Sequence, residues 1–195
     1  MSTFLGPIHY WLYNKIQLQE NLTEEISSLD KELYDQLDSL CGAAERRPLE
    51  EVIDTGNIHG WLQEQIILVE SRFASAVTHL LEKSSVALET LKNTAHTFGA
   101  SRPIQAATAP EVYKALQDLL LDGMPCDHVN QLEEQSDSQV IWHQAVDLHS
   151  SHWEKIGGDA SNYYELRSSL VSGMLQEAGF IFTKDGSRFF IKKHL

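Results

Sequence analysis

A pattern that occurs twice is the strongest constraint on how this chain folds. Residues 8–20 and residues 58–70 both read I-H-x-W-L-x-x-x-I-x-L-x-E, where x is any residue. On an α-helix, at about 100° per residue, the two Ile and the first Leu form an apolar stripe; Trp lies on one flank, and His and Glu lie on the other. The pattern therefore predicts two amphipathic helices of the same design. The similarity fades after Glu70, so it does not establish duplication of a whole domain.

Each copy is predicted to begin a long helix, because apolar residues continue beyond it at intervals of three or four. The first helix is expected over about 7–41 and the second over about 57–98. The simplest arrangement of two such helices is an antiparallel pair. That arrangement would place His9 and His59 at opposite ends of the pair.

A second arrangement follows if both long helices are broken, the first near residue 21 and the second near residue 84. Asn21-Leu-Thr-Glu24 resembles a helix-capping signal, and the apolar pattern weakens at Lys83-Ser84-Ser85. The two motif helices would then be parallel, with His9 facing His59. The two topologies make opposite predictions about whether these histidines share a ligand.

The second half of the chain is predicted to contain shorter helices and a C-terminal β-hairpin. Asp185-Gly186 lies between two runs of aromatic and β-branched residues, which is the strongest short-range signal for a hairpin. An isolated hairpin is only marginally stable, so its Phe and Ile side chains are expected to pack on the helices. Capping signals and apolar spacing predict helices over about 109–121, 137–156 and 162–178.

Together these elements predict a mainly α fold. It consists of a long antiparallel helical pair plus shorter helices forming a bundle, with the β-hairpin packed on it. The pair is assigned to residues 1–99 and the helical subdomain with the hairpin to residues 100–195, as parts of one compact unit. The length of 195 residues and the hydrophobic content of 42% are enough for a folded core. Long helices of this kind often complete their burial in a second copy, so a homodimer is expected.

Charge and cysteine content restrict the class of partner and the compartment. The net charge is -13 and the pI is near 5.0, a balance that repels nucleic-acid phosphates and anionic lipids. No apolar run approaches the roughly eighteen residues of a membrane span, and the N-terminus lacks the basic region of a signal peptide. Cys41 and Cys126 occur in unrelated contexts and are interpreted as reduced thiols. The sequence thus predicts a cytoplasmic protein that binds neither nucleic acid nor membrane.

The most informative candidate residue lies on the helix expected over 137–156. On that helix, His149 falls within the same arc of roughly 100° as Trp142 and Trp153. Its imidazole should therefore be buried. Burying an imidazole without a partner costs a few kcal/mol, so a hydrogen bond, an ion or a ligand should satisfy it.

A metal site is predicted around this histidine. His149 and His152 are one helical turn apart, a spacing that holds one metal ion, and Cys126 and His128 supply two more donors. A set of nitrogen and sulfur donors suits zinc or iron. The alternative is a core His149 satisfied by a hydrogen bond, with His152 facing solvent.

A second group of residues is predicted to bind a small cofactor. Tyr163, Tyr164 and Arg167 lie early in the last helix, and with the two tryptophans they could line an aromatic pocket with one fixed cation. Such a pocket suits a small carboxylate or phosphate. The alternative is ordinary helix packing, with the charged end of Arg167 reaching solvent. The predicted cofactor-binding residues are His9, His59, Trp142, Trp153, Tyr164 and Arg167.

Three functions are compatible with these patterns. The leading one is a binding protein that holds a metal ion or small cofactor among its histidines. The second is an enzyme that acts on a small molecule through Cys126 or His149. The third is a structural or protein-interaction module in which the histidines are incidental. No Gly-rich phosphate loop, G-x-S-x-G or H-E-x-x-H motif occurs in the sequence to favour a particular chemistry.

Overall fold

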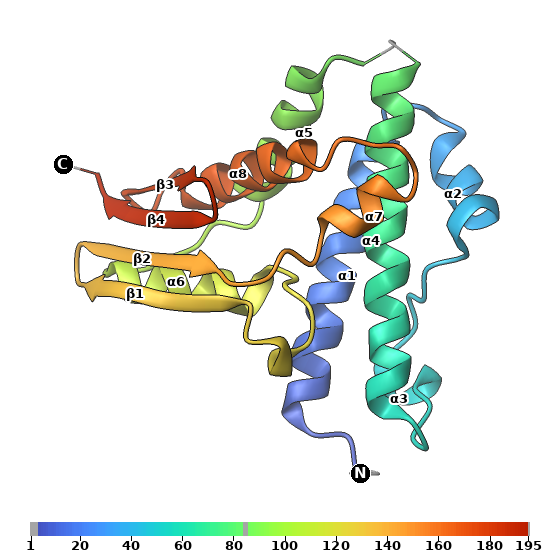
Figure 1. Ribbon diagram of the computed structural model, residues 1–195, viewed down its shortest axis with the longest axis horizontal. Helices are drawn as coiled ribbons and strands as arrows, with labels where there is room; N and C mark the ends of the chain where they lie inside the picture. The colour runs from blue at the N-terminus through green and yellow to red at the C-terminus, as the bar shows by residue number, and fades with distance from the viewer. Residues whose placement is uncertain (1–3, 84–85, 195) are drawn as a thin grey trace.

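The computed structural model describes residues 4–83 and 86–194. In this part of the chain it is a mixed helix and sheet structure, 56% helical, with a four-stranded antiparallel sheet near the C-terminus (Figure 1). The α-helices are α1 (Pro7–Ser27), α2 (Leu33–Cys41), α3 (Leu49–Val52), α4 (Ile58–Glu82), α5 (Leu88–Ala100), α6 (Ala109–Leu119), α7 (Ser150–Glu154) and α8 (Ser161–Leu175). The strands are β1 (Asn130–Ser136), β2 (Gln139–Gln144), β3 (Phe180–Asp185) and β4 (Arg188–Lys193).

The two motif helices, α1 and α4, are parallel. Figure 1 shows them side by side with their N-terminal ends at the same end of the molecule. There the rings of His9 and His59 lie 5.7 Å apart between centroids. The antiparallel pair predicted from the sequence is therefore wrong, and the parallel alternative is confirmed. The chain returns along the length of the pair through α2 and α3.

The single helix expected over 7–41 is two helices, and the break lies later than the capping signal at Asn21. The helix α1 ends at Ser27, and Ser28 donates its hydroxyl to the carbonyl of Glu25 at 2.6 Å. The Asp30 carboxylate then accepts the backbone N–H of Glu32 at 3.2 Å. Side chains that bond the nearby backbone in this way compete with helical hydrogen bonds and end the helix.

The second long helix is also divided. The helix α4 ends at Glu82 and α5 begins at Leu88. The break predicted near residue 84 falls on residues 84–85, which lie outside the described residues. The described flanks agree with two helices in place of one over 57–98.

The predicted hairpin is confirmed, but it is only half of the sheet. Strands β3 and β4 pair across a turn at Gly186, whose positive φ of 56° suits glycine. The strand order is β1-β2-β4-β3, so β2 pairs with β4 and joins a second hairpin to the first. The side of the sheet that carries Trp142 packs against α6, as expected for a sheet with one buried face.

The prediction of one helix over 137–156 is wrong. Its first part is strand β2, and only α7 is helical. The four residues taken for a helix cap, Ser136–Gln139, close the β1–β2 turn instead: the Gln139 backbone N–H donates to the Ser136 hydroxyl at 3.2 Å. The run Val140-Ile141-Trp142 is β-branched and aromatic, and burial between β1 and β4 outweighs the helical spacing of its apolar residues.

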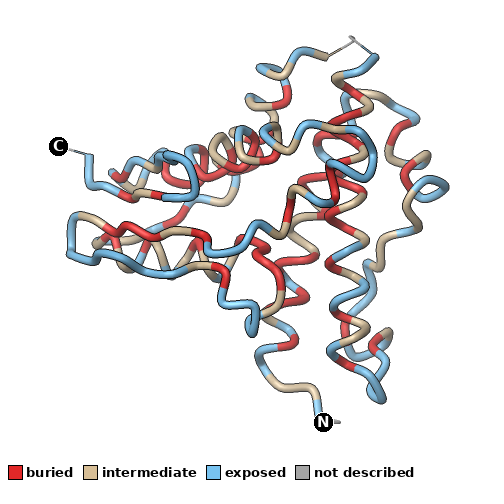
Figure 2. Tube along the Cα trace, in the orientation of Figure 1, coloured by how far each residue is buried: buried red, intermediate tan, exposed pale blue. Residues whose placement is uncertain are grey.

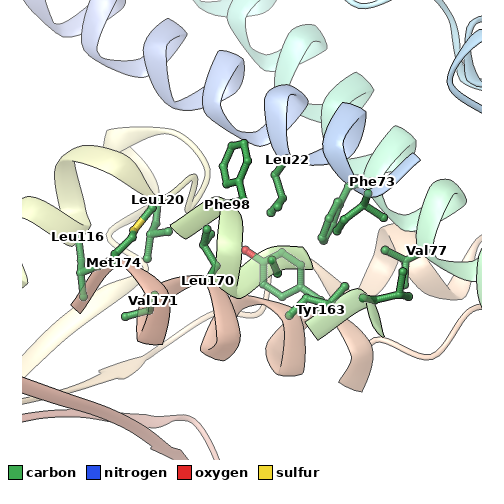
Figure 3. Packing of buried hydrophobic residues seen from close by; sticks show 14 of the residues in the cluster. Leu22, Phe73, Val77, Phe98, Leu116, Leu120, Tyr163, Leu170, Val171 and Met174 are labelled. Carbon is green, nitrogen blue, oxygen red and sulfur yellow. The ribbon is translucent and has the colours of Figure 1, made fainter. Parts of the chain in front are cut away.

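The hydrophobic core joins the two predicted halves of the chain. Figure 2 shows buried positions on helices from both halves of the chain. One cluster of buried residues includes Leu22 and Phe73 from the motif helices together with Met174 from α8 (Figure 3). Two glycines let α5 and α8 approach closely. A Cβ on Gly99 would lie 2.1 Å from the Leu170 carbonyl oxygen, and one on Gly173 would lie 2.1 Å from the His96 carbonyl oxygen. Among the described helices, none combines the length and the apolar composition needed to cross a membrane.

Candidate functional site: a buried charge network beside a cleft

The centre of the molecule holds a buried carboxylate, Asp122, which follows α6. Arg167 of α8 donates two hydrogen bonds to it, at 2.6 and 2.9 Å. The amides of Asn130 and Gln144 donate to the same carboxylate at 2.9 and 3.3 Å. Arg167 also donates to the Tyr163 hydroxyl at 3.0 Å. The bidentate Arg–carboxylate pair fixes the position of both groups.

A second buried carboxylate, Glu70 of α4, reaches the same centre through His149. Both carboxylate oxygens of Glu70 lie 3.2 Å from the His149 Nδ1 atom. On the other side of the ring, His149 Nε2 lies 3.5 Å from an oxygen of Asp122. The imidazole stacks on the Tyr163 ring, with centroids 3.9 Å apart. Glu70, His149, Asp122 and Arg167 thus form one chain of alternating charge, named here the charge network.

The network fixes the protonation of its members. Burial by itself would lower the pKa of His149, but the charges of Glu70 and Asp122 and their hydrogen bonds raise it to about 9. Burial by itself would raise the pKa of Asp122, but Arg167 and His149 hold it well below its usual range. Burial raises the pKa of Tyr163 well above its ordinary value, so the phenol stays neutral. At neutral pH the two carboxylates and the two cations balance.

Such a network is costly to bury, since each charge loses its hydration. Replacement of a buried ion pair by apolar residues often leaves stability unchanged or raises it, so stability alone does not account for four buried charges. Strongly shifted pKa values beside a cleft are typical of functional sites. The surroundings of the network therefore indicate where a ligand would bind.

Glu70 and His149 line an open cleft of about 260 Å³ between α4 and α7. The size approaches the lower end of known small-molecule sites. The cleft also has a cation at Lys155, which is exposed, and an acid at Asp127. The remaining lining residues are Gln63, Ile66, Ile67, Gly123, Leu148, Ser151 and His152.

His152 is the second histidine of the cleft, and its state differs from that of His149. It is 8% exposed, and its Nδ1 atom lies 3.3 Å from the Ser71 hydroxyl of α4. Burial lowers the pKa of His152 below its ordinary value. At neutral pH a neutral imidazole and an imidazolium therefore border one cleft, which is the arrangement that separates an acid from a base in enzyme sites.

The predicted metal site is not formed. Among the residues that the structure describes, no three His, Cys, Asp or Glu side chains are grouped so that they could hold a metal ion. His149 and His152 do border the same cleft, but Cys126 and His128 are exposed. The pairing of histidines one helical turn apart was assumed on a helix that begins only at Ser150. The first nitrogen of His149 is instead occupied by Glu70.

The predicted cofactor residues fall into three places. Arg167 belongs to the charge network, and Tyr164 meets His149 edge-on at 6.2 Å between centroids. His9 and His59 pair at the N-terminal ends of the motif helices. The tryptophans are packing residues: Trp142 stacks on Phe189 and Trp153 meets Phe73 edge-on. The six residues thus do not share one pocket in this structure.

Three important residues were missed by sequence reasoning. Glu70 was visible as the last position of the repeat, but its partner lies 79 residues away. Asp122 follows the helix expected over 109–121, and its partner Arg167 lies 45 residues away. Lys15, 4% exposed, occurs inside the first motif copy. For Lys15 and Glu70 the local signal is a charged residue on a helix with an apolar stripe, whereas Asp122 lies outside the helices and carries no such signal.

Comparison of the chain with protein-family models, with curated proteins and with solved structures finds no match. The geometry of the cleft is therefore what indicates a function for this protein.

Proposed function

We propose that the protein binds a small polar molecule in the cleft between α4 and α7 and transfers a proton to or from it. The observation that supports this proposal is the presence of two histidines in opposite protonation states on one cleft. The class of reaction is general acid–base catalysis on a small molecule.

The Glu70–His149 pair acts as the proton donor. Both carboxylate oxygens of Glu70 face the Nδ1 atom at 3.2 Å and favour the charged form of the imidazole. His152 acts as the proton acceptor, held in position by Ser71. Lys155 binds an anionic group of the ligand at the rim, because it is the lysine that lines the cleft. Asp122 is a positioning residue that helps to keep His149 charged, and Arg167 holds Asp122 in place.

The protonation states are tested by NMR of the imidazole nitrogens between pH 5 and pH 10. We expect His149 to stay an imidazolium to about pH 9 and His152 to be neutral at pH 7. His143→Gln serves as the control for assignment, since His143 pairs with Glu133 on the sheet. A neutral His149 at pH 7 would refute the proposal.

Ligand binding is tested by a thermal-shift screen with free amino acids and small hydroxy and keto carboxylates. Compounds that stabilise the wild type should lose their effect in Lys155→Gln and in His152→Gln. Lys114→Gln, which changes an exposed lysine on α6, should keep the effect. Ligands whose effect is equal in all three variants bind elsewhere, and that result would exclude the cleft as the site.

A further inference from the structure

A second, separate cavity lies on the other side of Tyr163 and Arg167. It has a volume of about 20 Å³, enough for one particle of the size of a water molecule. Most of its wall is apolar, and five of its residues are labelled in Figure 3: Leu22, Phe73, Leu120, Tyr163 and Leu170. Its polar lining comes from Lys15, Gln19, Tyr163 and Arg167.

Three nitrogen groups around this cavity are hydrogen-bond donors that have no acceptor among the described residues. The Nε atom of Arg167 and the Nε2 atom of Gln19 are buried and have no hydrogen-bond partner within the described residues. The Nζ atom of Lys15 lies 3.9 Å from the centroid of the Trp11 ring, and no hydrogen bond from it to a described residue is present. Two unpartnered N–H groups, the Lys15 ammonium and a hydroxyl belong to the lining of a space that no carboxylate lines.

The charges around the cavity also indicate that an anion would bind there. Arg167 and His149 are neutralised by Asp122 and Glu70, which leaves the Lys15 cation, 4% exposed, without an acid in contact. The charges of Asp122 and Asp118 act on Lys15 without contact, and Asp118 already accepts from Lys114 and from the Trp11 indole. A buried cation without a counter-charge is expensive, and a bound anion would offset that cost.

We propose that this cavity is a binding site for a monatomic anion of the halide class, held by Lys15, Gln19 and Arg167. A halide accepts several N–H bonds and has no proton to place, which suits a site whose charged and unpartnered polar groups are donors. The small volume suits one such ion better than the larger sulfate or phosphate. The cavity shares no lining residue with the proton-transfer cleft, and Arg167 connects it to the charge network.

The first test measures thermal unfolding in buffer free of halide, with sodium chloride, sodium bromide or sodium sulfate added at matched ionic strength. We expect a rise in the melting temperature that saturates with chloride and bromide, because a ligand of the folded state stabilises it by mass action. With sulfate we expect only the non-saturating rise that follows from its exclusion from the protein surface. Equal responses to all three salts would show general ionic screening and overturn the proposal.

The second test uses Lys15→Met and Gln19→Leu, which remove donors without adding bulk, with Lys31→Met, a change at an exposed lysine away from the cavity, as the control. The halide response should be lost in Lys15→Met, weakened in Gln19→Leu and kept in the control. A halide response retained in both cavity variants would refute the site. Bromide anomalous scattering from wild-type crystals gives a readout that needs no variant: a peak in the cavity supports the proposal, and a water-like density without anomalous signal contradicts it.

Discussion

The two copies of the repeat place a glutamate at the same helical position, but the two glutamates have different partners. Glu20 of α1 is fully buried and accepts from Arg72 at 2.9 Å and from the Tyr34 hydroxyl at 3.0 Å. Glu70 of α4 contacts His149 and borders the cleft. An Arg cation keeps its proton at any pH that a protein survives, whereas an imidazolium can release one.

This difference shows that the repeat specifies the place of a buried carboxylate and not its role. The partner determines the role, and neither partner is part of the shared pattern. Arg72 lies just beyond the second copy, and His149 comes from α7. The Glu20–Arg72 pair is a structural ion pair between the motif helices. The Glu70–His149 pair joins α4 to the C-terminal half and can exchange a proton.

The largest effect is expected from Arg72→Met in the structural pair. The change leaves Glu20 buried without its cation and removes the bond from Arg72 to Asp38 at 2.7 Å. Loss of one partner of a buried pair costs about 3–5 kcal/mol, which urea denaturation would measure. Lys114→Met is the matched control and should change stability by less than about 0.5 kcal/mol. A loss below about 1 kcal/mol for Arg72→Met would contradict the assignment of a tight buried pair.

The Glu70–His149 pair should make the free energy of unfolding depend on pH. Because the folded pKa of His149 is about 9, above its ordinary value of 6.5, its contribution is complete below pH 6.5 and is lost as the pH rises through 9. The difference in unfolding free energy between the wild type and His149→Gln should therefore shrink by about 3 kcal/mol between pH 6 and pH 10.

The His149→Gln variant is needed as the reference, because the titration of Lys15 changes the unfolding free energy with pH in the opposite direction. Burial lowers the pKa of Lys15 to about 8, so the penalty for its charge is complete below pH 8 and is relieved as the pH rises above that value. Both proteins contain Lys15, and its contribution cancels in the difference. A difference that does not vary with pH would show that His149 is not charged in the folded state.

A smaller effect is expected from Glu70→Gln. His149 keeps Asp122 as a neighbour at 3.5 Å, so the imidazole is not left alone, and a loss of about 1–3 kcal/mol is expected. The pKa of His149 should fall, because one of the two carboxylates that raise it is gone, and imidazole NMR would detect the change. Glu64→Gln, an exposed position on the same helix, should change neither quantity.

The smallest effect is expected from Cys126→Ser. The thiol is free and exposed, and neither glutamate pair includes it. Stability should change by less than about 0.5 kcal/mol, and ligand stabilisation at the cleft should be unchanged. Loss of ligand stabilisation in this variant would favour the thiol-based enzyme considered from the sequence.

The sequence predicted those helices and strands whose signals lie within a few neighbouring residues. The repeat gave two amphipathic helices because apolar spacing reflects which face of a helix is buried. The hairpin at Gly186 followed from turn chemistry. The direction of α1 relative to α4 could not be read in this way, since it depends on the break at Ser28 and Asp30, where side-chain bonds interrupt an apolar pattern that otherwise continues.

The site was predicted only in part, and partly for the wrong reason. His149 is buried as expected, but the expectation used its angle on a helix that is largely strand β2. The alternative of a histidine satisfied by hydrogen bonding describes it better than the metal site does. Its partners Glu70 and Asp122 are distant in sequence, and pairing of distant charges leaves no local pattern. The homodimer and the cytoplasmic location stay predictions, which sedimentation and cell fractionation would test.

The parallel arrangement of α1 and α4 has a consequence for the order in which the protein folds during its synthesis. In a helical hairpin, the first helix finds its partner as soon as a short turn has been made. Here the matching end of α4, at His59, is made only after α2 and α3, because the paired ends at His9 and His59 are both N-terminal. During that interval α2 covers only part of the apolar surface of α1. The emerging chain therefore exposes apolar surface, which favours aggregation, for longer than a helical hairpin would.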